Sequence, residues 1–238
     1  MGTIPDNIFK LKWYDARGAP VPDVILYRLR VKKSVYFITI LVLSNALISL
    51  VATAYNRFNF SINLITKIYD LWFFILIISG IFYLPYHPRH YGLNMNRLKY
   101  NLTIGLLIGG TGAFISIMIR IYLIKSGHKE FSFNLSTRSF ILCSAYMVSC
   151  FLQDTLSRGF FQSYFVAVFR KNRWNRPISI LLTSLIFAQF HYVYGFSLVI
   201  GSFIYCFITG FIYEKTRSVV GITIIHFLTG ASMIHFTF

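Results

Sequence analysis

The chain has 238 residues, of which 56% are hydrophobic and only 13% charged, and its formal net charge at pH 7 is +16. Soluble domains carry roughly 25% charged residues, so this composition excludes an ordinary soluble protein, whose surface could not accommodate so many apolar side chains. Apolar stretches of about 20 residues recur along the chain, long enough to cross a hydrocarbon core of about 30 Å as helices. We therefore predict an all-α bundle of transmembrane helices.

Seven spans are expected in chain order. Their predicted ranges are 34–54, 68–86, 101–124, 139–165, 177–195, 196–213 and 218–238. Gly195 marks the expected break between the fifth span and the sixth. The domain organisation predicted from this pattern is a basic cytoplasmic segment over 1–33 followed by a single transmembrane domain over 34–238.

The basic residues sort by side of the membrane. If the N-terminus lies inside, the inner segments hold sixteen Lys and Arg residues, the outer loops hold five, and Arg120 and Arg158 fall within spans. This asymmetry predicts an N-terminus inside and a C-terminus outside. The charge is therefore explained without a nucleic-acid partner, and attraction of inner basic residues to anionic headgroups, about 1 kcal/mol each, is an additional possibility. The expected partner at this level is the lipid bilayer.

Three further features concern processing and packing. The first 33 residues lack the early apolar core of a cleavable signal peptide, so none is expected. Cys143, Cys150 and Cys206 are odd in number and lack paired spacing, which does not indicate a disulfide framework. Gly105 and Gly109 lie four residues apart, and Ala113 continues this small-residue face, on which a neighbouring helix can pack closely.

Ionisable side chains inside a bilayer cost a few kcal/mol each on insertion scales, so they are candidates for function. Asp154 and Arg158 lie well inside the fourth predicted span, His191 lies late in the fifth, and His226 lies in the seventh. Those near span ends, where they can reach the interface, are Asp70, Arg120 and His235.

Asp154 and Arg158 lie four residues apart, which on an α-helix predicts an ion pair on one face. A structural ion pair would by itself account for both residues without any functional role. However, Gln153 is adjacent, and His191 and His226 lie on two other predicted spans. We therefore expect three helices to contribute to one polar pocket.

Three motifs resemble those of a family of intramembrane proteases, the CaaX-processing and bacteriocin-processing or immunity proteins known as CPBP or Abi. The family's first motif, Glu-Glu-x-x-x-Arg followed by Gly, corresponds to QDTLSRG at 153–159. The second, Phe-x-x-x-His, corresponds to FAQFH at 187–191. The third, a His followed four residues later by Asn or Asp, corresponds to HFLTG at 226–230. The order and spacing match from about 139 to 232.

This resemblance implies hydrolysis of a peptide bond near the membrane surface, in a peptide or membrane-linked protein substrate. In the family, the first Glu activates water, the two His polarise the carbonyl or the developing oxyanion, and the Arg orients the second acid. The catalytic candidates carried over are Gln153, Asp154, Arg158, His191 and His226. No cofactor is expected; a metal would have only Asp154 and the two His as ligands and is not favoured. The expected location is a bacterial plasma membrane.

The sequence departs from the family pattern at two positions on which the chemistry depends. Gln153 replaces the expected base, and a Gln amide cannot take a proton from water; loss of a general base typically costs about 10² to 10⁴ in rate. Gly230 replaces the Asn or Asp of the third motif, where Thr229 or Ser232 is an alternative source of a hydroxyl.

Several explanations of Gln153 remain open at this point. The chain is a noncatalytic relative that binds a peptide, as an immunity-like protein would; or Gln153 is an isosteric replacement of a native Glu; or the chain is an active enzyme in which Asp154 is the base. A nucleophilic pair of Cys150 with a His is a further mechanism. Outside this family, a small transporter is the remaining function class, although few acids lie in the spans.

Overall fold

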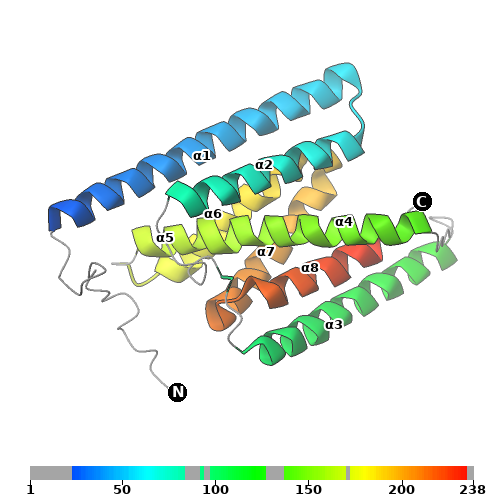
Figure 1. Cartoon of the computed structure of the whole chain (residues 1–238). Helices are drawn as coiled ribbons and strands as arrows, with labels where there is room; N and C mark the ends of the chain where they lie inside the picture. The colour runs from blue at the N-terminus through cyan, green and yellow to red at the C-terminus, as the bar shows by residue number, and fades with distance from the viewer. Residues whose placement is uncertain (1–22, 84–91, 94–96, 127–136, 170–171, 235–238) are drawn as a thin grey trace. The chain divides into compact units, whose positions relative to one another are not determined.

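The computed structural model describes residues 23–83, 92–93, 97–126, 137–169 and 172–234, which are helices and short connections without any strand. Contacts divide the chain into two units, Met1–Ser49 and Leu50–Phe238, which are treated separately. The first helix, α1, runs over Asp23–Phe58 and crosses this boundary (Figure 1). Most of the predicted 1–33 segment, and His235, lie outside the described residues. The predicted division into two domains stays a prediction.

The second unit is built from helices in chain order. Their bounds are α2 Ile62–Tyr83, α3 Leu98–Lys125, α4 Thr137–Asp154, π-helix η3 Thr155–Gln162, α5 Ser163–Val168, α6 Asn175–Gln189, 3₁₀-helix η4 Tyr192–Tyr194, α7 Phe196–Thr216 and α8 Val219–Ile234. Because α4, η3 and α5 follow one another without a break, they form one long helix. With that helix counted once, every predicted span corresponds to a helix, which confirms the all-α class.

Four helical segments are long and apolar enough to cross a membrane: Ser34–Phe58, Ile62–Phe82, Leu98–Ile119 and Phe196–Thr216. Val219–Ala231 is apolar but shorter. Large apolar side chains on α3 are widely exposed, for example Leu107 at 65% and Phe114 at 61%. Such a surface suits lipid and not water. The chain is therefore an integral membrane protein, while the number of spans and the side of the N-terminus stay predictions.

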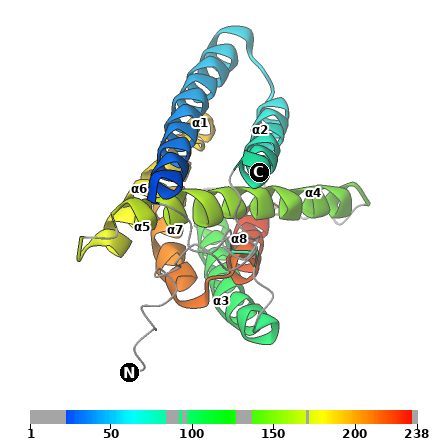
Figure 2. The same cartoon turned by 60° about the vertical axis from the view of Figure 1, so that its left-hand side comes forward.

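Glycines bring α3 and α8 close together. A β-carbon on Gly105 would lie 2.9 Å from the carbonyl oxygen of Gly221, and one on Gly221 would lie 2.7 Å from that of Asn101. A β-carbon on Gly109 would lie 3.0 Å from Cα of Ile225. The small-residue face predicted on this span is thus where α8 packs, and Figures 1 and 2 show α8 between α3 and α4.

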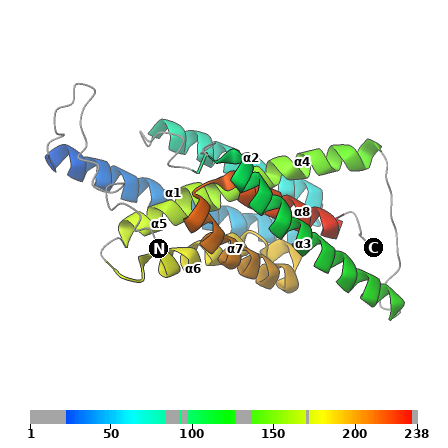
Figure 3. The same ribbon diagram turned by 90° about the horizontal axis from the view of Figure 1, so that it is seen from below.

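The predicted break at Gly195 is confirmed. Gly195 has φ +100°, a conformation that side-chain-bearing residues rarely adopt, and it separates η4 from α7. This turn lets α7 return alongside α6, as Figure 3 shows. Arg217, in the left-handed region, ends α7, and α8 begins two residues later. The predicted site residues lie in α4, η3 and α8 and just after the end of α6.

The π-helix η3 is the least regular part of the unit. It spans Thr155–Gln162, and all eight of its residues are buried. A π-helix is bonded from residue i to i+5, is rare, and occurs mostly as single turns inside α-helices, frequently at functional sites. Because η3 begins directly after Asp154, the α-helical spacing assumed for the first motif ends at this residue. The later residues of the motif therefore point in other directions than an α-helix would give.

Candidate active site

Asp154 and His226 form the central contact of the site. Asp154 is the last residue of α4 and His226 lies in α8, and Nδ1 of His226 is 3.2 Å from Oδ2 of Asp154. Both residues are buried, at 1% and 8% exposure. A carboxylate in this position accepts a hydrogen bond from Nδ1–H, which leaves the Nε2 lone pair of a neutral imidazole available.

His191 has a similar arrangement at the end of α6. Its Nδ1 lies 3.0 Å from the carbonyl oxygen of Phe187, one helical turn earlier. Because a carbonyl can only accept, Nδ1 must carry the proton, so Nε2 of a neutral His191 is also an acceptor. The two imidazoles therefore accept at Nε2 unless they are charged. This differs from the expectation that both donate toward a carbonyl.

Aromatic rings enclose the two imidazoles. The Phe187 ring lies 4.8 Å from that of His191 and 5.9 Å from that of His226, between centroids. Tyr205 and Tyr146 lie against His226, at 4.7 Å and 6.2 Å. Phe187 belongs to the second motif, and its place between the two His explains why a Phe is suited to that position. Tyr146 and Tyr205 were missed from the sequence, where nothing distinguishes them among 16 tyrosines.

Several polar atoms at this end of the helix have no partner. Oε1 of Gln153, Oδ1 of Asp154 and Oγ1 of Thr155 are buried and form no hydrogen bond with any described residue. Buried polar atoms are normally hydrogen-bonded, because an unmade bond costs about 1 to 3 kcal/mol. Three neighbouring exceptions indicate a place where a substrate or water is the missing partner.

Arg158 does not join this site. Among the described residues no ion pair links it to Asp154, so the predicted pair is wrong. Its guanidinium is fully buried and donates to Oε1 of Gln162 at 2.9 Å, to Oγ1 of Thr209 at 2.5 Å and to the carbonyl oxygen of Cys206. The prediction assumed α-helical spacing, whereas Arg158 lies in η3 and points to α7.

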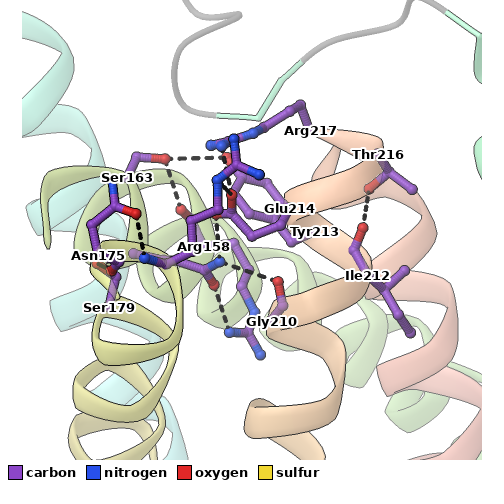
Figure 4. Close-up of polar contacts among 12 residues, drawn as sticks. Arg158, Ser163, Asn175, Ser179, Gly210, Ile212, Tyr213, Glu214, Thr216 and Arg217 are labelled. Carbon is purple, nitrogen blue, oxygen red and sulfur yellow. Dashed lines mark hydrogen bonds and ion pairs between the residues drawn. The ribbon is translucent and has the colours of Figure 1, made fainter. Parts of the chain in front are cut away.

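A polar network continues from Arg158 towards the end of α7 (Figure 4). Nε2 of Gln162 donates to the carbonyl oxygen of Gly210 at 3.1 Å and to Oε1 of Glu214 at 2.9 Å. The other Glu214 oxygen pairs with Arg217 at 2.6 Å and with Arg176 at 3.5 Å. This network of Arg158, Gln162, Glu214 and Arg176 thus holds η3, α6 and α7 together.

Gly230 lies against Tyr146. A β-carbon built on Gly230 would overlap the Tyr146 hydroxyl oxygen and lie 2.7 Å from its Cζ. Of the predicted alternatives, Thr229 donates to carbonyl oxygens of Ile225 and His226 in its own helix, and the Ser232 side chain lies outside the described residues, so a hydroxyl from either residue stays a prediction. The space of a side chain at position 230 is therefore filled by Tyr146.

Cys150 lies one turn before Asp154, is fully buried, and interacts with both His226 and Tyr146. All three cysteines are free. Within the described ranges, no group of three His, Cys, Asp or Glu residues lies close enough to hold a metal ion.

Residues 135–232 match the family model described as Type II CAAX prenyl endopeptidase Rce1-like. No curated protein and no solved structure matches the chain. The matched segment runs from just before α4 into α8 and includes all three motifs. The resemblance to the CaaX-processing intramembrane proteases is thus confirmed for this part of the chain, and it suggests a peptidase of that kind.

Proposed function

We propose that this protein is an intramembrane endopeptidase that hydrolyses a peptide bond in a peptide or membrane-linked protein, with His226 as general base. The contact between His226 Nδ1 and Asp154 Oδ2 carries the proposal. A carboxylate on Nδ1 fixes the tautomer and stabilises the imidazolium, as in a catalytic triad. An imidazole oriented by a carboxylate can thus act as the base in place of the family's first Glu, whose position is occupied here by Gln153.

The reaction needs one water molecule and no other reactant. His226 Nε2 takes a proton from water as the oxygen adds to the scissile carbonyl carbon, forming a tetrahedral intermediate. The imidazolium then gives the proton to the leaving nitrogen as the C–N bond breaks, which yields a carboxylic acid and an amine. His191, through Nε2, accepts a hydrogen bond from the same water, and the Gln153 amide positions the water or the carbonyl.

Arg158 has a positioning role in this proposal and no contact with substrate. Its bonds to α7 hold the turn of η3 that directly follows Asp154. This differs from the role that the family resemblance implied, in which the Arg orients the second acid.

A noncatalytic peptide-binding or immunity-like role is the second candidate, and Gln153 is the observation that favours it. Its amide can bind a peptide group through donor and acceptor but cannot take a proton. In that case the unpartnered atoms of Gln153 and Asp154 would bind an uncut peptide.

Cleavage of a panel of prenylated, otherwise lipidated and unmodified peptides by the purified protein in bilayers tests the proposal. We expect turnover by the wild type, and a loss of about 10² to 10⁴ in kcat for His226→Gln and for Asp154→Asn. Cys150→Ala should stay within a few-fold of wild type, and loss of activity there would indicate a thiol nucleophile instead. Tyr192→Phe, at a residue 63% exposed, is the matched control.

The Gln153→Glu variant separates the two candidates. If the wild type binds peptides without cutting them while Gln153→Glu cleaves in a His191-dependent manner, the wild type is the noncatalytic binder. If neither form cleaves any peptide, the enzymatic proposal is wrong. If the wild type is active and Gln153→Glu cleaves faster, the result supports His226 as the base of the wild type and as a weaker base than a Glu at position 153.

A further inference from the structure

Gly230 and Tyr146 are spatially matched. A side chain at 230 and the present Tyr146 ring exclude each other, because a β-carbon on Gly230 would overlap the phenol oxygen and lie 3.0 Å from Cε1. The two residues come from α8 and α4, one turn after His226 and two turns before Asp154. The glycine therefore admits the phenol into a position beside the pair that carries the proposed chemistry.

The Tyr146 hydroxyl lies among the groups of the site. The Tyr146 ring stands edge-on to the His226 ring, at 83° and 6.2 Å between centroids. Tyr146 also has a side-chain hydrogen bond with Cys150, which a substrate oxygen would replace, and an electrostatic interaction with the Asp154 carboxylate. A phenol hydroxyl can donate one hydrogen bond to a substrate oxygen that lies beside it.

Among the described residues of the site, the two imidazoles do not supply a donor for a developing negative charge while they are neutral. The Nδ1 protons of His191 and His226 are used by the Phe187 carbonyl and by Asp154. When both imidazoles are neutral, their Nε2 atoms accept and do not donate. The Gln153 amide is the other donor at this end of the helix. Stabilisation of an oxyanion is usually the largest single contribution to acyl-transfer catalysis, so a donor beside the base is of direct use to the proposed reaction.

We infer that the Tyr146 hydroxyl donates the hydrogen bond that stabilises the oxyanion of the tetrahedral intermediate, in the space left by Gly230. This inference rests on the proposed function. No bond to Tyr146 is made or broken: its proton stays on the phenol oxygen while the carbonyl oxygen gains and then loses negative charge. Tyr146 is accordingly an additional catalytic residue, contributed by α4 in place of a side chain on α8.

Tyr146→Phe removes only the hydroxyl and is the main test. We expect kcat to fall by about 10²-fold with KM nearly unchanged, because the bond strengthens only when charge develops. Tyr122→Phe, on the exposed face of α3 at 71% exposure, is the matched control and should retain wild-type kcat. If Tyr146→Phe has the same kcat as the wild type, and the activity of both is lost when His226 is replaced, the inference is overturned. The proposed function is not affected by that result.

A swap tests the spatial match. Tyr146→Ala makes room at 230, so Tyr146→Ala with Gly230→Asn supplies an amide donor from α8. This double variant should be at least ten-fold more active than Tyr146→Ala alone, whereas Gly230→Asn in the wild-type background should lower the folded yield. A double variant no more active than Tyr146→Ala counts against a donor role.

Binding provides a readout that does not require turnover. A peptide phosphinate carries a tetrahedral anionic centre, and Tyr146→Phe should weaken its binding about ten-fold or more while leaving the uncut amide peptide unaffected. Equal weakening of both ligands would show a structural role of the ring and overturn the inference. If no peptide is cleaved by any variant, the proposed function fails, and this binding comparison still decides whether Tyr146 donates to a tetrahedral anion.

Discussion

The helical stretch from Cys150 to Gln162 has buried polar atoms at both ends, yet the two ends differ in how these atoms are satisfied. Around Gln153 and Asp154, three side-chain oxygens lack a partner. Around Arg158 and Gln162, nearly every donor and acceptor is used, Arg158 Nε being the exception. Unmade hydrogen bonds lower stability, so the first end is suited to bind a ligand and the second to hold helices.

The π-helix joins these two ends and accounts for the difference. Up to Asp154 the chain is α-helical, and its carboxylate points to His226 in α8. From Thr155 the backbone follows π-helical bonding, and Arg158 points to α7. One sequence motif is consequently divided between a site and a scaffold. This division can be tested by comparing stability with activity.

The largest effect on stability is expected from Arg158→Ala. The change removes three hydrogen bonds and leaves Gln162 Oε1, Thr209 Oγ1 and the carbonyl oxygen of Cys206 without the guanidinium donor at a buried position, which should lower the free energy of unfolding by about 3 to 5 kcal/mol. Unfolding in SDS followed by circular dichroism measures it. Arg173→Ala, at an exposed arginine, is the matched control. Unchanged stability with lost activity would place Arg158 in the chemistry instead.

A smaller effect is expected from Gly210→Ala. The new methyl group would lie 2.6 Å from Cγ2 of Ile180 and 3.0 Å from Nη1 of Arg158, so it should destabilise the protein by about 1 to 3 kcal/mol. Gly201 lies in the same helix, and a β-carbon there would meet no described atom within 4 Å apart from the adjoining backbone of α7, so Gly201→Ala should be neutral. The same unfolding measurement compares the two. Equal stability of both variants would show that this part of the scaffold is loosely packed.

The smallest effect is expected from Glu214→Gln. The amide keeps an acceptor for Gln162 but loses the attraction to Arg176 and Arg217, whose side chains are 48% and 37% exposed. Because solvent screens such pairs, the loss should be about 0.5 to 1 kcal/mol and should shrink at high salt. A loss that is independent of salt would indicate that the network is effectively closed to solvent.

Composition and hydropathy were enough to predict the helices of this chain. Each predicted span matches a helix, because a run of about 20 apolar residues has little alternative in a membrane. The small-residue face on α3 and the break at Gly195 were also predictable, since close helix packing and a φ of +100° both favour glycine. These features depend on residue type and hydropathy over short segments, which can be read from the sequence.

The site was predicted in its members but not in its contacts. Asp154 and His226 were both expected, yet their contact depends on how α4 packs on α8, which no spacing reveals. The ion pair of Asp154 with Arg158 was predicted wrongly, because the sequence gives no sign that π-helical bonding begins at Thr155. Tyr146 could not be chosen at all, since its role depends on a glycine 84 positions away in the sequence.

The central claim is that Asp154 and His226 act as one unit in peptide-bond hydrolysis. A double-mutant cycle on kcat, with Asp154→Asn, His226→Gln and the double variant compared at equal amounts of folded protein, tests it most directly. We expect each single variant to lose about 10² to 10⁴ in kcat and the double variant to be no slower than the slower single one. Losses that multiply in the double variant, or a fully active Asp154→Asn, would contradict the account.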